Sequence, residues 1–276
     1  MKIRPFLKWV GGKTQLIKEI EKRMPKNFNN YLEPFIGGGA LFFNMHNSNN
    51  NFIINDISSE LINAYKAIKE NPQKLMKLLD EHELNHGLNS KEYYFLIREQ
   101  DRDINWNKKN IFIKTARLIY LNKTCFNGLY RVNKSGYFNV PWNKKEKIKL
   151  YEKNNILNLS RILNSNVEIL NSDFENVCNY AQKGDFIFFD PPYDLIKKDT
   201  FDNYTKDKFG IEGQKRLSNL AHKLKEKGCY VMITNHNTPL INELYKDFTI
   251  DVVPVKRMIN SNGEGRVGIE TIIYNY

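Results

Sequence analysis

Short apolar runs alternate with longer amphipathic segments along most of the chain. A short apolar run bounded by polar residues is typical of a buried strand, and apolar residues at helical spacing are typical of a helix. Strands are expected to begin at residue 31 and to cover residues 51–56, 167–170, 186–189, 230–234, 248–255 and 268–276. Helices are expected at residues 13–24, from residue 41, from residue 58, again after a break at Asn71-Pro72, and at residues 111–121 and 211–227.

The order of these elements predicts the fold class and the domains. Alternating strands and helices at both ends of the chain favour an α/β fold with a Rossmann-like, doubly wound sheet. The last two strands are expected to close this sheet as an antiparallel pair. Residues 58–149 are mostly helical and carry a predicted β-hairpin at residues 130–141, with its turn at residues 133–136. We therefore expect one domain formed by residues 1–57 and 150–276, and a second domain inserted at residues 58–149.

The tetrapeptide Asp190-Pro191-Pro192-Tyr193 follows directly after the apolar run 186–189. Two consecutive prolines fix their own φ angles and keep the preceding residue extended, so the chain leaves the strand as a rigid loop. The Asp190 carboxylate and the Pro191 carbonyl could then accept hydrogen bonds from one exocyclic amine, while the Tyr193 ring stacks on the heterocycle that carries it. The alternative is an ordinary proline turn, so the interpretation needs support from other segments.

A glycine-rich loop provides the first support. Gly37 and Gly39 stand between the first expected strand and an apolar helix. Glycine lets the backbone approach a ligand closely, and the amide groups at a helix start attract anionic or polar groups. The next strand closes with Asp56, 19 residues after Gly37, where a carboxylate can bind both ribose hydroxyls of an adenosine cofactor.

The charge of the chain is concentrated in one region. The formal net charge is +11, and residues 104–153 contain twelve Lys or Arg against two acids. A strongly basic region is expected to bind a polyanion, although lysines also serve as a solubilising surface. Aromatic residues and glycines interleave with these charges, which favours a nucleic-acid surface that stacks on bases or wedges between them.

Several other classes are disfavoured by the sequence. No apolar run approaches the length of a membrane span, and the charged start of the chain does not resemble a signal peptide. Three cysteines without paired spacing argue against disulfides and zinc clusters. A cytoplasmic location is therefore expected.

Two short motifs resemble sites of other classes. Residues 11–14, Gly-Gly-Lys-Thr, look like the end of a phosphate-binding loop, but Leu7 occupies the position of the required first glycine. His82 and His86 have the spacing of a two-histidine zinc site, but Gly87 follows at once and no third ligand is evident. We expect neither a Walker motif nor a metal site.

Four segments together resemble the Dam-type DNA adenine-N6 methyltransferases, and the resemblance extends from residue 6 to the end of the chain. These segments are Phe6-Leu-Lys-Trp-Val-Gly-Gly-Lys13, Glu33-Pro-Phe-Ile-Gly-Gly-Gly39, Phe126-Asn-Gly-Leu-Tyr-Arg131 with Phe138-Asn-Val-Pro141, and Asp190-Pro-Pro-Tyr193. Their order is similar to the α arrangement of amino-methyltransferases. The resemblance implies S-adenosyl-L-methionine as the methyl donor and transfer to N6 of an extruded adenine in double-stranded DNA, usually within GATC. A cognate restriction endonuclease is a possible functional partner.

The resemblance also implies roles for single residues. Trp9 and Lys13 match positions that line the methionine end of the cofactor, and Phe35 matches one that flanks its adenine or methionine part. Gly37, Gly39, Asp56 and Asp190 complete the expected cofactor set together with Asp173 and Phe174. For Asp173 two interpretations stay open, because a strand-end aspartate either accepts from the cofactor adenine or caps the next helix.

The expected DNA contacts lie in the basic region and at the N-terminus. Lys8 and Arg131 match positions that read guanine edges, and for Arg131 a bidentate fork in the major groove is expected. Phe126 and Asn127 match positions that fill the gap left by the extruded base. Leu129 and Pro141 complete the expected DNA-binding set. The stretch Trp142-Asn-Lys-Lys departs from the family pattern, which leaves the phosphate contacts there undefined.

Two alternatives to this function stay open. An RNA adenine-N6 methyltransferase would use the same tetrapeptide, whereas the basic insertion favours duplex DNA. A catalytically inactive DNA-binding regulator on the same fold would be expected to have a damaged tetrapeptide or glycine loop, and both are intact.

Overall fold

The computed structural model describes residues 3–9, 16–45, 50–195, 209–256 and 267–276. The chain forms two compact units. We call Lys13–Ile36, Asn49–Ile57 and Ser172–Tyr276 the sheet unit, and Met1–Gly12, Gly37–Ser48 and Ser58–Asn171 the helical unit. The helical unit thus contains the predicted insertion 58–149 together with further segments, and the functional division at residues 57 and 150 stays a prediction.

The sheet unit contains a mixed sheet with the strand order β2-β1-β4-β5-β7-β6. The parallel strands are β2 (Asn51–Asn55), β1 (Asn30–Glu33), β4 (Phe186–Phe189) and β5 (Tyr230–His236). The antiparallel strands are β7 (Val267–Tyr274) and β6 (Thr249–Lys256). The predicted closing antiparallel pair is confirmed.

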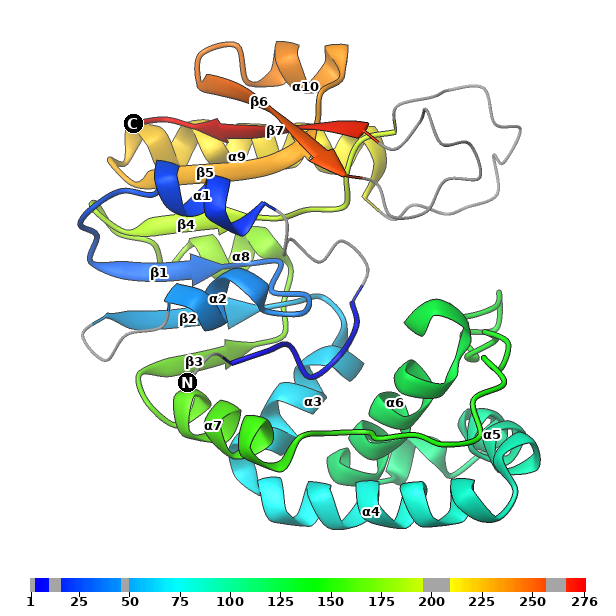
Figure 1. The fold of residues 1–276 in the computed structure, drawn as a ribbon. Coiled ribbons are helices and arrows are strands. Elements are labelled where there is room, and N and C mark those ends of the chain that lie inside the picture. The colour runs from blue at the N-terminus through cyan, green and yellow to red at the C-terminus, as the bar shows by residue number, and fades with distance from the viewer. Residues whose placement is uncertain (1–2, 10–15, 46–49, 196–208, 257–266) are drawn as a thin grey trace. The chain divides into compact units, whose positions relative to one another are not determined.

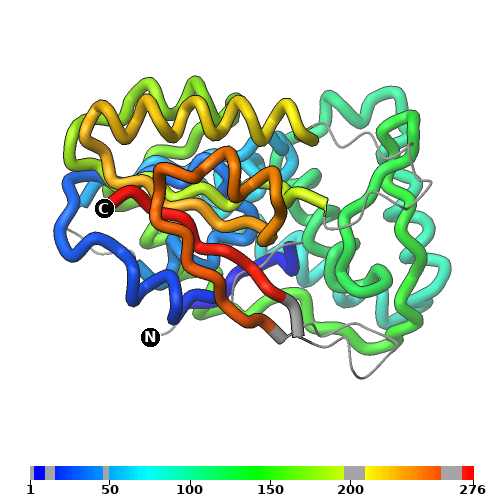
Figure 2. Tube along the Cα trace, turned by 90° about the horizontal axis from the view of Figure 1, so that it is seen from above, coloured from blue at the N-terminus to red at the C-terminus, as the bar shows by residue number. Residues whose placement is uncertain are grey.

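Helices cover both faces of this sheet. Because side chains alternate along a strand, Leu32, Ile187 and Val231 point to one face, where α8 (Phe174–Cys178), α9 (Gly210–Glu226) and α10 (Pro239–Leu244) pack against them. Helix α1 (Ile17–Arg23) lies on the opposite side of the strands from α9 (Figures 1 and 2). Parallel strands buried by helices on both faces confirm the predicted Rossmann-like, doubly wound α/β fold.

The helical unit is built mainly from helices, and α3 to α6 each begin at a side-chain cap. Its longer helices are α3 (Ser59–Glu70), α4 (Pro72–Leu88), α5 (Ser90–Glu99), α6 (Ile111–Thr124) and α7 (Lys153–Leu163). Its shorter elements are α2 (Ala40–Met45), η1 (Gln100–Arg102), η2 (Trp106–Lys108), η3 (Phe126–Gly128) and the strand β3 (Val167–Leu170).

The break predicted at Asn71-Pro72 is the start of α4. The Asn71 side chain accepts a hydrogen bond from Lys74 N, and Pro72 takes the first helical position, where its missing N–H costs nothing. Asn110 caps α6 in the same way through Ile113 N at 3.1 Å. These caps give a physical reason for two of the predicted helix starts, whereas α5 and α7 were not predicted as separate helices.

The predicted hairpin at residues 130–141 forms with little regular strand. A single antiparallel bridge joins Val132 to Phe138, and Asn133 N donates to Tyr137 O at 2.8 Å. The turn at residues 133–136 is present, since Gly136 N donates to Asn133 O at 3.0 Å. We call residues 126–141 the hairpin loop.

Candidate active site and nucleic-acid interface

The parallel strands of the sheet unit define a position for a ligand. Strand β1 pairs with β2 on one side and with β4 on the other, so the chain changes direction across the sheet at β1. In doubly wound sheets, ligands bind at the carboxyl ends of the strands beside this switch point. Phe35 follows β1 and Asp190 follows β4, so both stand at the carboxyl ends that this rule selects.

Asp190 is bound by the neighbouring strand. Thr234 Oγ1 of β5 donates a hydrogen bond to Asp190 Oδ1 at 2.7 Å. The register of β4 and β5 pairs Phe189 with Ile233, which places the next residues, Asp190 and Thr234, beside each other. Thr234 is fully buried, whereas Asp190 is half-buried. One carboxylate oxygen is therefore fixed in orientation by the sheet.

The loop after Asp190 is held by two buried amide side chains. Gln214 Nε2 of α9 donates to the Pro192 carbonyl at 2.8 Å, and Asp194 N donates to Asn235 Oδ1 at 2.9 Å. Asn235 Nδ2 also donates to Gln214 Oε1 at 3.1 Å, so the two anchors support each other. Within the described part of the chain, these bonds leave the Pro191 carbonyl without a protein donor.

Tyr193 is fixed at its ring and at its hydroxyl group. Its ring meets the His236 ring edge to face, with 4.8 Å between centroids, and its hydroxyl donates to Glu270 Oε2 at 3.0 Å. Burial and then the negative charge of Asp190 raise the pKa of Tyr193 well above its usual value. The phenol is therefore neutral at physiological pH, and the ring orientation is set by protein contacts.

Asp56 lies at the end of β2, where Asn55 fixes the backbone. Asn55 Nδ2 donates to Pro34 O at 2.9 Å and to Ser172 O at 3.0 Å, while Asn55 Oδ1 accepts from Ser172 N at 2.8 Å. Ile36 N donates to the Asn55 carbonyl at 2.8 Å. Asn55 is buried and Asp56 is half-buried. The buried Asn55 amide thus joins the end of β2 to the segments that contain Pro34 and Ser172. The next residue, Asp56, lies at the carboxyl end of β2.

Phe35 belongs to an aromatic cluster of the sheet unit. Its ring centroid lies 5.3 Å from that of Phe174 and 5.7 Å from that of Phe209. The guanidinium of Arg216 lies over the Phe174 ring, 4.9 Å from its centroid. Phe174 is buried and Phe35 is half-buried. Phe209 is half-buried as well, so the cluster exposes Phe35 and Phe209 as an apolar surface on which a planar group could stack.

Asp173 acts as a helix cap. Its Oδ1 accepts from Glu175 N at 3.0 Å at the start of α8 and from Arg216 NH2 at 2.8 Å. Of the two interpretations of this residue, the structure bears out the cap. Its contact with a cofactor adenine stays a prediction.

The glycine loop has the conformation for which glycine is required. Gly37 and Gly39 have φ angles of +48° and +70° in the left-handed region. A Cβ on Gly39 would stand 2.7 Å from both Phe43 Cε2 and Tyr65 Oη, so packing as well as backbone geometry requires glycine here. Tyr65 also donates to the Gly37 carbonyl at 2.9 Å.

Trp9 lies beside this loop within the helical unit. A Cβ on Gly37 would stand 3.2 Å from Trp9 Cδ1, so the indole edge covers that glycine. The indole stacks on Tyr130, with 5.5 Å between centroids and 29° between planes. Trp9 therefore contacts both the glycine loop and the hairpin loop. Lys13, the other residue expected at the methionine end, lies outside the described residues.

The predicted DNA-binding residues come together in the helical unit. Buried Asn122 donates to the Lys8 carbonyl at 2.9 Å and to the Gly128 carbonyl at 2.9 Å, which ties the N-terminal segment to the start of the hairpin loop. Phe126 N donates to the Pro141 carbonyl at 2.8 Å and closes that loop.

The start of the hairpin loop is exposed and carries Phe126 and Asn127. Phe126 is 53% exposed. Asn127 has a φ of +56°, a left-handed conformation that asparagine tolerates. Exposed Lys8 and half-buried Leu129 lie on the adjoining segments. The geometry brings together the residues expected to fill and flank a gap in a duplex.

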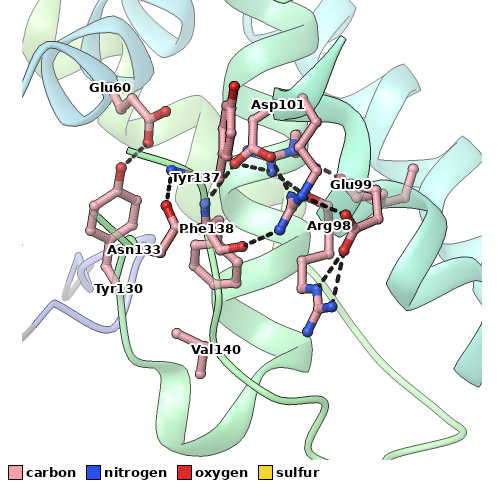
Figure 3. A network of polar contacts seen from close by, with 12 residues as sticks. Glu60, Arg98, Glu99, Asp101, Tyr130, Asn133, Tyr137, Phe138 and Val140 are labelled. Carbon is pink, nitrogen blue, oxygen red and sulfur yellow. Dashed lines mark hydrogen bonds and ion pairs between the residues drawn. The ribbon is translucent and has the colours of Figure 1, made fainter. Parts of the chain in front are cut away.

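The base of the hairpin loop is anchored by a polar network (Figure 3). Asp101 Oδ2 accepts from Phe138 N at 2.7 Å and from Arg117 NH2 at 2.8 Å, and Tyr130 Oη donates to Glu60 Oε2 at 2.5 Å. Arg117 is only 4% exposed, so one of the twelve basic residues in the region 104–153 supports the loop from within and adds nothing to the surface charge.

The two-histidine motif has a structural role. His82 Nδ1 bonds to Tyr93 Oη at 2.7 Å, His86 Nδ1 bonds to Tyr120 Oη at 2.8 Å, and His86 Nε2 bonds to Lys145 O at 2.9 Å. Burial lowers the pKa of His82 to about 4. Among the described residues no group of three or more His, Cys, Asp or Glu is arranged to hold a metal ion.

No helix in the described part of the chain is long and apolar enough to cross a membrane.

Several residues of the candidate site were not expected from the sequence. They are Thr234, Asn235 and His236 at the end of β5, Gln214 in α9 and Glu270 in β7. A signal for the first three was present, because a polar triplet ends an apolar run and strand ends are where ligands bind in such sheets. Gln214 and Glu270 had no such signal, since each depends on a contact distant in sequence.

Comparison with known proteins agrees with these observations. A sequence model for D12 class N6 adenine-specific DNA methyltransferases matches residues 9–259. A Type II methyltransferase from Lactococcus lactis subsp. cremoris is 43% identical over 277 residues, covering 99% of this chain and 96% of the relative. A Type II methyltransferase from Methanocaldococcus jannaschii is 41% identical over the full length of both chains. A DNA adenine methylase from Haemophilus influenzae is 34% identical, covering 99% of this chain and 93% of the relative. The chain therefore belongs to the D12 class of N6 adenine-specific DNA methyltransferases, the family that its four motifs resemble.

Proposed function

We propose that the protein transfers a methyl group from S-adenosyl-L-methionine to N6 of an adenine in duplex DNA, within the sequence GATC. The observation that carries the proposal is the rigid loop Asp190–Tyr193 at the carboxyl end of β4. Its carboxylate, its ring and its backbone are each fixed by a neighbouring residue of the sheet unit.

The residues expected to hold the methyl donor fit an adenosine with a methionine tail. Phe35 and Asp56 are both half-buried, and we propose that Phe35 stacks on the adenine and that the Asp56 carboxylate accepts from the ribose hydroxyls. Asp173 and Phe174 are proposed for the adenine, and Trp9, Gly37 and Gly39 for the methionine part, with Lys13 and Asp190. When bound, S-adenosyl-L-methionine supplies an electrophilic methyl group on a sulfonium centre.

The role of the loop is to orient the adenine amine. The N6 lone pair is delocalised into the ring, so the amine is a weak nucleophile. Hydrogen bonds from its two N–H groups to the Asp190 carboxylate and the Pro191 carbonyl would draw the nitrogen towards a tetrahedral shape and direct its lone pair at the methyl group. Stacking on Tyr193 would hold the ring in place. Such positioning and electrostatic stabilisation account for most of the expected rate.

The hairpin loop is proposed to open and read the duplex, with residues 58–149 as the target-recognition domain. Extruding a base costs a few kcal/mol of unstacking, which Phe126 and Asn127 would offset by filling the gap. Arg131 is proposed to read the outer guanine of GATC through a bidentate contact, assisted by Lys8. Leu129 and Pro141 are proposed as further DNA contacts.

Two further parts of the proposal concern the cellular setting. Relatives at 41% and 43% identity are named Type II methyltransferases, so a restriction endonuclease that cuts the same sequence is proposed as a functional partner. The proposed location is the cytoplasm, where the DNA substrate of such a system lies.

Methylation of synthetic duplexes tests the function and the sequence together. Wild-type protein is expected to transfer tritiated methyl groups to adenine in a GATC duplex, and Arg131→Ala is expected to lose roughly 1 to 3 kcal/mol of discrimination at the outer G·C pair. Duplexes substituted at each position of GATC should show that loss at one pair. A higher rate on single-stranded RNA than on the duplex would contradict the proposal, and a uniform loss in Arg131→Ala would make Arg131 a backbone contact.

A further inference from the structure

Arg131 is already bound within the protein. Its Nε donates to Asn139 Oδ1 at 2.8 Å, and its NH2 donates to the Asn139 carbonyl at 3.2 Å. Asn139 N in turn donates to the Arg131 carbonyl at 3.1 Å, across the hairpin loop. Among the described residues, no acidic side chain pairs with Arg131, and its guanidinium bonds go to Asn139. A single asparagine therefore sets the orientation of this guanidinium.

Asn139 is itself held between two buried residues. Phe138 is 3% exposed and Val140 is 1% exposed. Asp101 accepts from Phe138 N at 2.7 Å, and Arg102 NH2 donates to the Phe138 carbonyl at 3.3 Å (Figure 3). These bonds fix the peptide groups on the N-terminal side of Asn139.

The C-terminal side of Asn139 is fixed from α5. The hydroxyl of Tyr94, which is fully buried, donates to the Val140 carbonyl at 2.8 Å. Burial raises the pKa of Tyr94 well above its usual value, so this donor keeps its proton at physiological pH. A continuous set of hydrogen bonds thus runs from α5 and η1 through the buried backbone to Asn139 and on to Arg131.

This arrangement selects which edge of the guanidinium is available. Arginine has five N–H donors in a planar fork, and a bidentate contact uses two of them on one edge. Asn139 occupies the Nε edge, so NH1 and the second hydrogen of NH2 form the edge that is directed away from Asn139. Arg131 is exposed. The edge formed by NH1 and NH2 is therefore open to a ligand with two adjacent acceptors.

We propose that Asn139 is a positioning residue for base recognition, because it holds the Nε edge of Arg131 and presents the NH1–NH2 edge to the O6 and N7 acceptors of guanine. The proposal rests on the function proposed above, in which Arg131 reads the outer G·C pair. A preoriented arginine loses less side-chain freedom on binding than a free one, which favours the cognate base over others.

The discriminating measurement is the ratio of kcat/KM on a GATC duplex to kcat/KM on a duplex with the outer G·C pair replaced by A·T. Asn139→Ala should lower this ratio roughly three- to tenfold, the equivalent of about one ordinary hydrogen bond, because the Nε contact is lost while the contact of NH2 with the backbone carbonyl remains. Asn139→Asp keeps an acceptor at the same position and should retain most of the ratio. Arg131→Ala should lower it further, and the double variant should be no worse than Arg131→Ala alone.

Asn143→Ala is the matched control. The Asn143 side chain also bonds to nearby backbone: its Nδ2 donates to Lys123 O at 3.2 Å, and its Oδ1 accepts from Lys145 N at 3.0 Å. It makes no contact with Arg131. Its ratio should equal that of the wild type. Damage to the fold alone would lower kcat/KM on both duplexes equally and leave the ratio unchanged, and thermal unfolding identifies such variants.

The outcomes separate this proposal from the one it rests on. If Arg131→Ala lowers the ratio but Asn139→Ala leaves it unchanged, Asn139 has no positioning role and the proposed function stands. If Arg131→Ala itself leaves the ratio unchanged while the wild type methylates GATC, Arg131 does not read the pair and both assignments for these residues fail. If the wild type methylates no duplex, the proposed function fails as a whole.

Discussion

The loop Asp190–Tyr193 and the hairpin loop are held in different ways. In the first, side chains from β5, α9 and β7 bind the carboxylate, the backbone and the phenol of the loop itself. In the second, the anchors from Asp101 and Tyr94 reach the buried backbone at the base, while Phe126 is more than half exposed. The first loop is fixed at its functional groups, whereas the second is anchored mainly through its backbone, with Arg131 held by Asn139.

This difference follows from what each loop is proposed to do. A group that orients a reacting amine contributes most when its geometry is set in advance, because no reorganisation is then needed during the reaction. A loop that reads a duplex has to present exposed side chains to base edges and phosphates. Changes in the first loop are therefore expected to affect the chemical step, and changes in the second to affect sequence choice and affinity.

The largest effect is expected from removing the carboxylate of the first loop. Asp190→Ala should lower single-turnover methylation by roughly a hundredfold to a thousandfold, while the variant stays folded and binds duplex DNA. Rapid-quench assays and gel-shift titrations measure the two quantities. Asp251→Ala is a matched control, because Asp251 forms a half-exposed pair with Arg23 at 2.5 Å in the same unit.

A near-normal single-turnover rate in Asp190→Ala would contradict the proposed role. An equal loss in Asp251→Ala would assign the effect to general damage of the sheet unit, which thermal unfolding would also detect.

The second effect concerns the base of the hairpin loop. Asp101→Ala leaves the buried Arg117 without its carboxylate, and breaking a buried pair costs roughly 3 to 5 kcal/mol of unfolding free energy. Glu99→Ala is a sharp control. Glu99 is 45% exposed and pairs with Arg98 at 2.9 Å and with Arg102 at 2.5 Å. Because these pairs are partly exposed and do not include Arg117, the loss of Glu99 should cost less than about 1 kcal/mol. Chemical denaturation measures both variants.

The double variant Asp101→Ala with Arg117→Met separates the two contributions of Asp101. It removes the uncompensated charge and should recover much of the lost stability. If the single and double variants were equally unstable, the bond from Asp101 to the Phe138 backbone would matter more than the pairing with Arg117.

The features that could be predicted from the sequence are local ones. The apolar run 186–189 and the two prolines after it are neighbours in the chain, so their strand and loop follow from backbone preferences alone. The start of α4 at Asn71-Pro72 is equally local. The resemblance of four motifs then indicated which residues to bring together.

The features that escaped prediction depend on contacts between distant segments. Thr234 binds Asp190 only because of the register between β4 and β5, and Asn139 binds Arg131 only because the hairpin loop folds back. Arg117 was counted as surface charge, since composition does not distinguish a buried arginine from an exposed one. Asp173 was left between two roles because a helix cap and a ligand acceptor require the same residue type at the same place.

A smaller effect is expected from loosening the first loop. Thr234→Val keeps the shape of the buried side chain and removes the donor to Asp190 Oδ1. The carboxylate should then orient the amine less well, and single-turnover methylation should fall by roughly five- to tenfold, the equivalent of about one hydrogen bond. Thr234→Ser keeps the hydroxyl and should retain more of the rate. Equal rates for valine and serine would show that this bond does not position Asp190.

The smallest effect is expected from exposed charge beside the hairpin loop. Lys108 and Lys109 are exposed at the end of η2, whereas Lys114 already donates to Asn107 O at 2.9 Å. If Lys108 and Lys109 contact phosphates, replacing both by Ala should reduce the slope of log affinity against log salt by about 0.9 for each contact, with sequence preference unchanged.

Lys114→Ala should change that slope less, because the Lys114 ammonium group already donates to the Asn107 carbonyl. Replacing the exposed Lys18 and Lys26 of the sheet unit by Ala provides a charge-matched control. Duplex titrations at several salt concentrations measure the slope for each variant. An equal reduction in the Lys18 and Lys26 variant would indicate that net charge alone governs affinity. An unchanged slope in the Lys108 and Lys109 variant would assign these lysines to solvent.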